Sequence, residues 1–278
     1  MTPTVPYAEL CTTSNFTFLR GASHPEELVT RAAELGLTAI AITDRNSVAG
    51  VVRAYSALKE LARLRDEALA AQASVQESPE IRSQKVMDHS SRQSVPHSTG
   101  TMAAPAIADI QLPKLIPGAR LVLTDSAVNW LALPTDLAAW SRLTRLLSLG
   151  KRRAPKGDCH LTRADLQDWG RDMVLIALPS DPMETTGADL DTIRADILRL
   201  ARSFPGQCYL GMAPAYDGRD QARFDHLADL AQRMGTPMVA VGDVLMHRAA
   251  RRPLADVLTC LRLGLTIDSI GHHRLTHG

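Results

Sequence analysis

Short apolar runs alternate with amphipathic helical patterns along most of this chain, and this alternation constrains the fold more than any other feature. The run AIAIT at 39–43 is continuous and apolar, as in a strand buried on both faces. Similar runs lie at 173–178 and 238–242, with helical patterns between them. Repeated strand–helix units predict a parallel sheet covered by helices. Six or seven such strands fit a closed or nearly closed α/β barrel at least as well as an open sheet.

The other elements follow from the same periodicities. We expect further strands at 7–12, 120–123, 130–133 and 208–212. We expect helices that begin at Ser23, where a capping-box pattern precedes Pro25, and at Ser47, and then over 137–149, around 190–200 and 224–234, and near Pro253. In α/β barrels the chemistry lies at the C-terminal ends of the strands. Three predicted strands end near an acid, namely Asp44, Asp125 and Asp243.

The alternation is interrupted at 71–112. Residues 84–101 are rich in Ser, Gln, His and Pro and have almost no large apolar side chains. Such a segment cannot bury enough apolar surface to offset an ordering cost of ~1–2 kcal/mol per residue. We therefore predict a disordered insertion within a loop, and we interpret His89 and His97 as solvated linker residues rather than metal ligands.

Composition excludes several classes of protein. The 278 residues carry 31 Lys+Arg against 30 Asp+Glu, so the net charge of +1 gives no overall attraction to nucleic acid or to anionic membranes. No stretch approaches the ~18 consecutive apolar residues of a membrane span, and the first residues do not resemble a signal peptide. We therefore expect a cytoplasmic protein. The absence of a CxxC pair argues against a disulfide scaffold or zinc ribbon built on Cys11, Cys159, Cys208 and Cys260.

Three segments carry the informative motifs, CTTSNFT at 11–17, FLRGAS at 18–23 and ITDRNSVAG at 42–50. Together they resemble the start of a PHP domain (polymerase and histidinol phosphatase). That family opens with HxHSxxS on its first strand and has a TDH motif at the end of its second strand. Ser14, Thr17 and Asp44 match these motifs.

A closer resemblance is to the N-terminal region of error-prone C-family bacterial DNA polymerases, the ImuC-type branch. It rests on five blocks in the same order, SNFTFLRGASHPEELV at 14–29, ITDRNSVAGVVRA at 42–54, GARLVLTD at 118–125, LTRLLSLGKRRAPKGDCHL at 143–161 and RRPLADVLTCLRLGLTID at 251–268. The resemblance implies a distorted seven-stranded α/β barrel over 1–268. Residues 269–278 would then be a truncated tail, at the point where relatives continue into the polymerase core.

An intact PHP site holds two or three divalent ions that activate water for attack on a phosphate ester. The resemblance implies that most of its ligand positions are replaced here, by Cys11, Thr13, Arg20, Arg45 and Arg120, while Asp44 and Asp243 remain. Arginine cannot ligate a metal. We therefore expect no metal, although Cys11 could act as a soft ligand and His247 as a surviving one.

The arginines could instead neutralise the remaining acids. We expect Arg45 and Arg120 to form charge-assisted hydrogen bonds with Asp44 and Asp243, in place of the lost ions. The alternative is that these arginines point to solvent. His247 is more simply explained as a structural residue than as a ligand.

Two surfaces are candidates for contacts with other molecules. The basic cluster of Lys151, Arg152, Arg153 and Lys156 could contact DNA or an acidic surface of polymerase domains, and a solvated loop is an equal interpretation. The helix near Pro253 carries apolar residues that could pack onto a polymerase palm, namely Leu254, Val257, Leu258 and Leu263.

The leading hypothesis is a metal-free scaffold domain from an error-prone polymerase used in damage-tolerant synthesis and DNA repair. Polymerisation in the family needs palm aspartates that hold Mg²⁺, and this chain has no palm segment, so it would be inactive alone. Its partners would be the polymerase core domains and, through them, DNA. One alternative is a metal-dependent phosphoesterase or 3′–5′ exonuclease with a rearranged site. Another is a free-standing interaction module.

Overall fold

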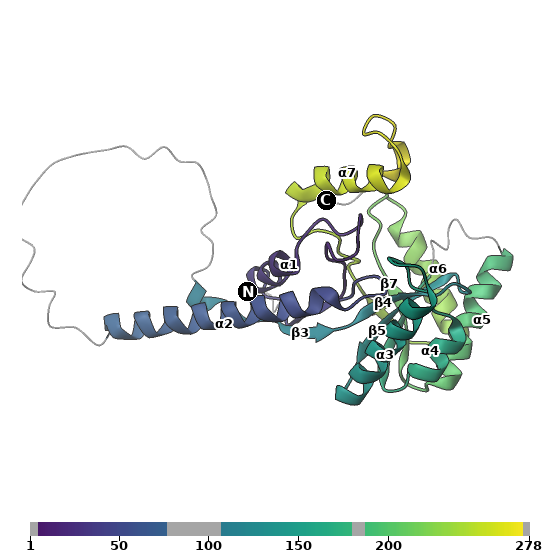
Figure 1. The fold of residues 1–278 in the computed structure, drawn as a ribbon, viewed down its shortest axis with the longest axis horizontal. Helices are drawn as coiled ribbons and strands as arrows, with labels where there is room; N and C mark the ends of the chain where they lie inside the picture. Colours follow the sequence, from purple (N-terminus) through teal and green to yellow (C-terminus); the bar gives the residue numbers. More distant parts are fainter. Residues whose placement is uncertain (1–4, 77–106, 180–186, 275–278) are drawn as a thin grey trace, which may run out of the picture.

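The computed structural model describes residues 5–76, 107–179 and 187–274, and within these ranges strands and helices alternate as the sequence indicates (Figure 1). The strands are β1 (Ala8–Thr12), β2 (Ala39–Ile42), β3 (Lys114–Pro117), β4 (Ala119–Val122), β5 (Val128–Pro134), β6 (Met173–Pro179), β7 (Cys208–Met212) and β8 (Met238–Ala240). The helices are α1 (Pro25–Glu34), α2 (Ala49–Gln76), α3 (Leu137–Arg153), α4 (Arg163–Trp169), α5 (Gly187–Ser203), α6 (Asp220–Met234) and α7 (Arg252–Leu263).

The strands form two sheets. One is parallel, in the order β1-β2-β3, and the other has the order β4-β5-β6-β7-β8. In the second sheet β5 is antiparallel to both β4 and β6, while β6, β7 and β8 are parallel. The prediction of a wholly parallel sheet is therefore wrong at β5. The connection at 123–127 is too short for the crossover of a dozen or more residues that a parallel neighbour requires.

The two sheets meet at isolated bridges rather than along a continuous ladder. Thr12, at the end of β1, bridges to Val244 after β8, and Arg45, after β2, bridges to Arg120 in β4. Strands β3 and β4 are separated by Gly118 alone, so the chain leaves one sheet and enters the other at this residue. The strand pairing shows an α/β fold, and closure of a seven-stranded barrel stays a prediction.

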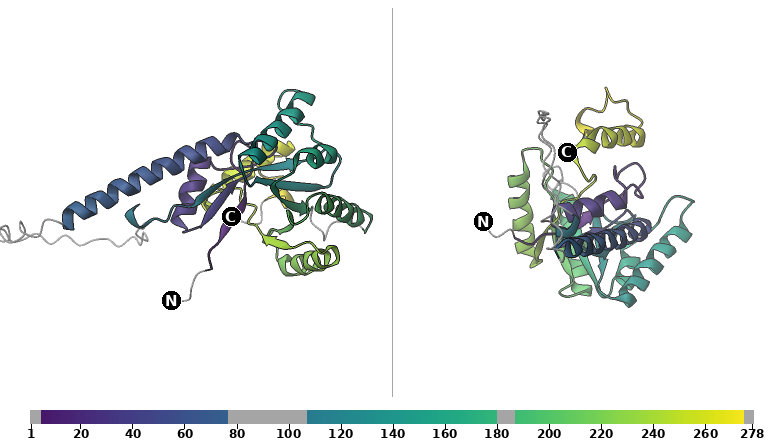
Figure 2. Two further views of the ribbon diagram at one scale, coloured as in Figure 1. Left: turned by 90° about the horizontal axis from the view of Figure 1, so that it is seen from below. Right: turned by 90° about the vertical axis from the view of Figure 1, so that its left-hand side faces the viewer.

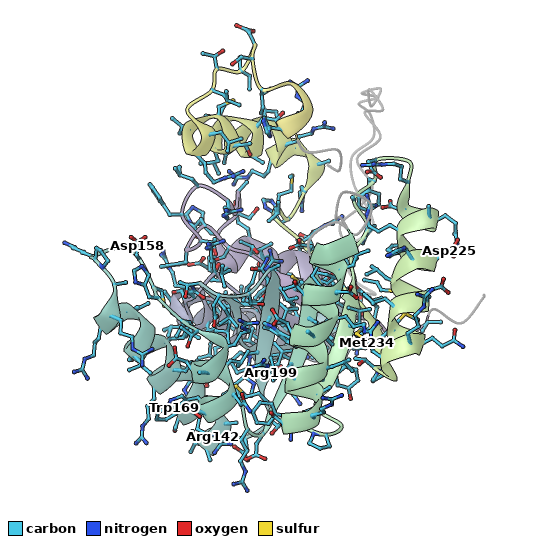
Figure 3. All side chains as sticks on the ribbon, turned by 90° about the vertical axis from the view of Figure 1, so that its right-hand side faces the viewer. Arg142, Asp158, Trp169, Arg199, Asp225 and Met234 are labelled. Carbon is cyan, nitrogen blue, oxygen red and sulfur yellow. The ribbon has the colours of Figure 1, made fainter. Side chains whose placement is uncertain are left out.

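Two apolar clusters hold the helices on the sheets. The larger one packs α3 to α6 around the second sheet and includes Trp130, Leu143 and Leu175, all fully buried. A smaller cluster packs α1 and α2 on β2 through Leu28, Ile40 and neighbouring side chains. Figure 2 shows the distal part of α2 projecting beyond the sheets, and Figure 3 shows α7 standing apart from the other helices.

Several boundaries differ from the sequence-based predictions. Helix α1 begins at Pro25, because Glu27 Oε2 accepts a hydrogen bond of 2.9 Å from the backbone N–H of His24, so Ser23 is not the cap residue. Apolar periodicity predicts neither strand β3 nor helix α4. Residues 71–76 continue α2 and Ile107–Asp109 form a 3₁₀ turn, so the predicted disordered insertion over 71–112 is wrong at both ends. Residues 77–106, with His89 and His97, lie outside the described residues.

The segment after α7 is partly folded onto that helix. Gly271–His273 form a 3₁₀ turn, Ile270 is buried, and Arg274 Nε lies 3.1 Å from Asp256 Oδ2. In the described part of the chain, no helix combines the length and the apolar character that a bilayer crossing requires.

The bend at Gly118 generates a testable prediction. A Cβ at this position would lie 2.5 Å from Leu133 Cδ2 and 3.0 Å from the carbonyl oxygen of Ala132, inside the neighbouring strand. We expect Gly118→Ala to lower the free energy of unfolding by about 1–3 kcal/mol, as overpacking does elsewhere. Urea denaturation followed by circular dichroism measures the change. An unchanged midpoint would show that Leu133 and the neighbouring part of β5 move aside at no cost.

Candidate functional site

The seven positions that the resemblance singled out gather where β1, β2 and β8 end and β4 begins. Backbone hydrogen bonds join these ends, since Thr43 N donates to Thr12 O and Thr13 N donates to Val244 O, both at 2.8 Å. A cavity of about 200 Å³ opens here, which we call the arginine pocket. Its lining residues are Thr13, Thr17, Arg20, Arg45, Arg120, Asn129, Asp243, Leu245, Thr259 and Arg262.

Asp44 contacts the pocket-lining residue Thr17 and is fully buried. Its Oδ1 accepts hydrogen bonds of 2.8 Å from Ser14 N and Thr17 Oγ1, and its Oδ2 accepts one of 2.8 Å from Ser14 Oγ. Burial raises the pKa of Asp44, and these hydrogen bonds together with one from the Gly50 N–H oppose the shift. Both carboxylate oxygens are therefore occupied by donors from the protein.

Arg120 takes the central place in the pocket. Its Nη2 forms an ion pair with Asp243 Oδ1 and lies 2.8 Å from Cys11 Sγ. Cys11 is fully buried, and its Sγ lies 3.4 Å from Asp243 Oδ1. Burial lowers the pKa of Arg120, but the neighbouring Cys11 and Asp243 outweigh burial and raise it overall. One guanidinium thus contacts two of the predicted degenerate ligand positions.

Arg45 does not behave as predicted. Its backbone N–H donates to Thr17 Oγ1 at 2.9 Å, but within the described ranges its side chain forms no ion pair with Asp44 or Asp243. Asp44 receives its hydrogen bonds from hydroxyl and backbone donors instead. Arg45 and Arg20 both remain exposed to solvent on the pocket wall. The expected Asp44–Arg45 pairing is wrong, and Arg120–Asp243 is the pair that forms.

Sequence reasoning missed two residues of this region. Glu9 is buried in β1, and its Oε1 accepts hydrogen bonds from Cys11 N at 2.8 Å and Gly242 N at 3.0 Å. Burial raises the pKa of Glu9, with the backbone hydrogen bonds opposing it. Arg262, on α7, lines the arginine pocket. Glu9 could have been found from the sequence, because it is a charged residue inside a predicted strand. The sequence around Arg262 contains no motif that indicates a site.

His247 lies outside the pocket and has a structural environment. Its Nδ1 lies 2.8 Å from Ser23 Oγ, and its backbone N–H donates to the same oxygen at 3.0 Å. The ring nitrogen is 3.8 Å from Glu27 Oε2. These contacts tie the segment after β8 to the start of α1, as expected for a structural histidine.

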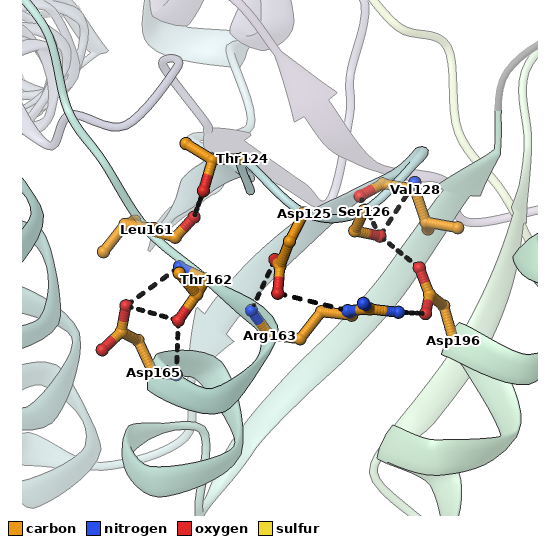
Figure 4. A network of polar contacts seen from close by, with 9 residues as sticks. All are labelled: Thr124, Asp125, Ser126, Val128, Leu161, Thr162, Arg163, Asp165 and Asp196. Carbon is orange, nitrogen blue, oxygen red and sulfur yellow. Dashed lines mark hydrogen bonds and ion pairs between the residues drawn. The ribbon is translucent and has the colours of Figure 1, made fainter.

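Asp125, the third strand-end acid, also lies outside the pocket. Its Oδ1 accepts a hydrogen bond of 2.8 Å from Arg163 N, and the Arg163 side chain reaches both Asp125 and Asp196 (Figure 4). Asp196 in turn accepts a hydrogen bond of 2.6 Å from Ser126 Oγ. This network joins α4 and α5 to the turn before β5. Its charged side chains bind one another and so hold these elements together.

The basic cluster occupies the end of α3 and the following loop. Lys151, Arg152, Arg153 and Lys156 are all exposed to solvent. Arg153 Nη1 contacts Asp165 at 2.7 and 2.8 Å, so its charge is neutralised. Lys151 lines a larger cavity of about 710 Å³ that shares Thr17, Arg20 and Arg45 with the arginine pocket.

The donors present do not suit a divalent ion. Within residues 5–76, 107–179 and 187–274 no group of three or more His, Cys, Asp or Glu side chains could hold a metal. Burial and the nearby Asp243 raise the pKa of Cys11, which disfavours the thiolate that a metal would bind. The oxygens of Asp44 and the Oδ1 of Asp243 already receive protein donors.

Comparisons with known proteins show which sequences this chain resembles. A family model described as "PHP domain" matches residues 9–127. The chain is 58% identical over 269 residues to the error-prone DNA polymerase of Ruegeria pomeroyi, covering 97% of this chain and 23% of the relative. The chain matches the N-terminal region of error-prone DNA polymerases.

Other relatives are more distant but cover the chain equally well. The error-prone DNA polymerases of Rhodopseudomonas palustris and Caulobacter vibrioides are 38% and 37% identical, each over 95% of this chain and 19% of the relative. The chain thus spans about a fifth of the length of these polymerases. A solved structure described as a metal-dependent phosphoesterase, from Bifidobacterium adolescentis, aligns with a TM-score of 0.49 at 14% identity, over 88% of this chain and 89% of that one.

The two buried carboxyls predict contrasting effects of neutralisation. In Glu9→Gln the amide oxygen can keep both backbone hydrogen bonds and the amide nitrogen can donate to Tyr7 Oη, which lies 3.0 Å from Glu9 Oε2. We expect this change to cost less than about 1 kcal/mol at neutral pH. Asp44→Asn places an amide N–H against donors and should cost roughly 3 kcal/mol.

The raised pKa of Glu9 also predicts that the stability of the fold depends on pH. Because the folded-state pKa of Glu9 is raised, its contribution to stability is complete below the unfolded pKa and is lost as the pH rises through the folded pKa. The difference in unfolding free energy between wild type and Glu9→Gln should therefore move in favour of the variant as pH rises from about 4. Urea titrations across pH 4 to 8 measure it, and a difference that does not change with pH would contradict the raised pKa.

A double-mutant cycle tests the ion pair in the pocket. Arg120→Ala and Asp243→Ala together should cost less than the sum of the single changes, because neither charge is left without its partner. The Asp243 side chain is 36% exposed, so solvent screens the pair and the coupling should be on the order of 1 kcal/mol. The Arg45–Asp243 cycle is the control, since no ion pair joins those residues and its coupling should be smaller. Equal coupling in both cycles would exclude a specific Arg120–Asp243 interaction.

Proposed function

We propose that this chain is a metal-free structural domain of an error-prone DNA polymerase that serves damage-tolerant (translesion) synthesis and DNA repair. The observation that carries the proposal is the placement of Arg120, whose guanidinium contacts both Cys11 and Asp243 in the region expected to hold metal. A fixed cation there supplies the charge that divalent ions would supply in a catalytic relative. The similarity to error-prone polymerases supports the biological setting.

The proposed fold is a distorted barrel in which β3 and β4 are two halves of one strand, bent at Gly118. The bridges from Thr12 to Val244 and from Arg45 to Arg120 support this interpretation, because they connect the two sheets on both sides. Closure by a few bridges at the C-terminal strand ends draws the loops of the arginine pocket together. The domain then acts as a rigid support rather than as a catalyst.

Helix α7 is the surface that we propose for contact with the polymerase core. Several apolar side chains on it are exposed, with Leu261 at 63% and Leu254, Val257 and Leu263 at 40% or more. Such clustered exposed apolar side chains mark an interaction surface. The exposed charges of Lys151, Arg152 and Lys156 offer a second contact, with DNA or with an acidic face of the core. In this proposal Mg²⁺ belongs to the polymerase core, the whole protein acts in the cytoplasm, and DNA is a partner through the core.

The competing function is a metal-dependent phosphoesterase or 3′–5′ exonuclease. It would require the Arg120–Asp243 pair to open and Cys11 to ionise, against the burial that raises the pKa of that thiol. A free-standing interaction module is a third possibility, distinguished by whether the chain binds the polymerase core that its relatives contain.

Metal analysis tests the proposal. The purified chain, incubated with Zn²⁺, Mn²⁺ or Fe²⁺ and desalted, should retain less than one ion per molecule by mass spectrometry. It should also fail to hydrolyse a nitrophenyl phosphate or to shorten a labelled primer. Two or more ions retained per chain, reduced by Asp243→Asn, would establish the phosphoesterase alternative and end the scaffold proposal.

A further inference from the structure

The arginine pocket carries more positive charge than its own carboxylate can balance. Four arginines line it, Arg20, Arg45, Arg120 and Arg262, and Asp243 is the one acidic side chain among its lining residues. Asp243 is already paired with Arg120. Within the part of the chain that the structure describes, the guanidiniums of Arg20, Arg45 and Arg262 form no ion pair and donate no hydrogen bond to the protein.

The arginines also act on one another. Burial lowers the pKa of Arg20, repulsion from Arg262, Arg45 and Arg120 lowers it further, and attraction to Asp243 opposes this shift. Burial and repulsion from Arg120 lower the pKa of Arg45 in the same way. The protein thus holds like charges within interaction range of each other, which costs folding free energy unless a counter-charge is present.

The pocket also offers neutral donors. Thr13, Asn129 and Thr259 line it, and among the described residues their side chains have no hydrogen-bonding partner in the protein. Hydroxyl and amide groups can donate to the oxygens of an anion that the guanidiniums neutralise. The donors come from the segment after β1, from β5 and from α7, so they approach the cavity from different directions.

We propose that the arginine pocket binds a phosphate group, without a metal ion. Guanidinium groups bind phosphate through paired N–H donors, and several around one anion provide both charge and geometry. The volume of about 200 Å³ is below the range typical of organic-ligand pockets, so it suits a small anion such as orthophosphate or pyrophosphate. The adjoining cavity of about 710 Å³, which shares Arg20 and Arg45, leaves room for a longer molecule that ends in a phosphate.

This inference deepens the proposed function and rests on it, because a metal-free pocket is what leaves the arginines available. The experiments can overturn the scaffold proposal and the phosphate-binding proposal independently of each other. Retained metal ions would overturn the scaffold proposal whether or not phosphate binds. A metal-free chain that binds no phosphate would overturn this inference alone.

Isothermal titration calorimetry with pyrophosphate, in buffer stripped of metals by a chelating resin, tests the inference on the full chain. Wild type should show saturable binding of one pyrophosphate per chain, and binding should weaken as salt increases. Arg45→Gln and Arg262→Gln should each lower the affinity about tenfold, as expected for loss of one charge-assisted contact. Both side chains are exposed to solvent, so these variants should fold.

Arg145→Gln is the matched control, since Arg145 is an exposed arginine on α3 that lines no described cavity and forms no described ion pair, and it should bind like wild type. Competition by a 5′-phosphorylated oligonucleotide, compared with the same oligonucleotide lacking the phosphate, distinguishes a nucleic-acid end from a free anion. No saturable binding, or equal binding by wild type, Arg45→Gln and Arg262→Gln, would overturn the proposal. Binding that appears only with added divalent ions would overturn it as well.

Discussion

The buried carboxylate of Asp44 is the constraint on which the rest of the site depends. Removing an ionised carboxylate from water costs several kcal/mol or more, and only convergent donors can offset that cost. Ser14 and Thr17 supply them from the loop after β1, and Gly50 supplies one from the start of α2. A Cβ at Gly50 would lie 2.4 Å from Asp44 Oδ2, so glycine is required where the helix approaches. The loop that carries Arg20 is held in place by this cluster.

Arg120 neutralises a second acid in the same region, Asp243. Asp243 has a left-handed backbone, with φ of 46°, and its carboxylate is turned toward Cys11 and Arg120. Without a cation this partly buried acid would stand beside the buried Glu9, whose pKa it helps to raise. An apolar replacement at position 120 would leave the carboxylate of Asp243 without its cation, while Glu9 would keep its backbone donors. The Arg120 guanidinium therefore supplies the positive charge that Asp243 requires in this partly buried position.

Apolar periodicity predicted most elements because burial on both faces leaves a continuous signal, as in AIAIT at β2. It missed β3, whose four residues KLIP are partly exposed, follow Pro113 and end in Pro117. It could not give the direction of β5, since the apolar pattern is the same for parallel and antiparallel strands. The resemblance located the site positions. It could not predict that Arg120 rather than Arg45 pairs with an acid, because that depends on which lone pairs other donors already occupy.

The number of arginines in the pocket exceeds what its own carboxylate requires. One guanidinium is enough for Asp243, and Asp44 needs none, because Ser14 and Thr17 satisfy it. If Arg20, Arg45 and Arg262 only filled space, uncharged residues would do so without mutual repulsion. The three come from separate parts of the chain, the loop after β1, the end of β2 and α7, so no shared helix or turn explains their proximity. A fold that brings unpaired like charges together is stabilised when a bound anion supplies the counter-charge.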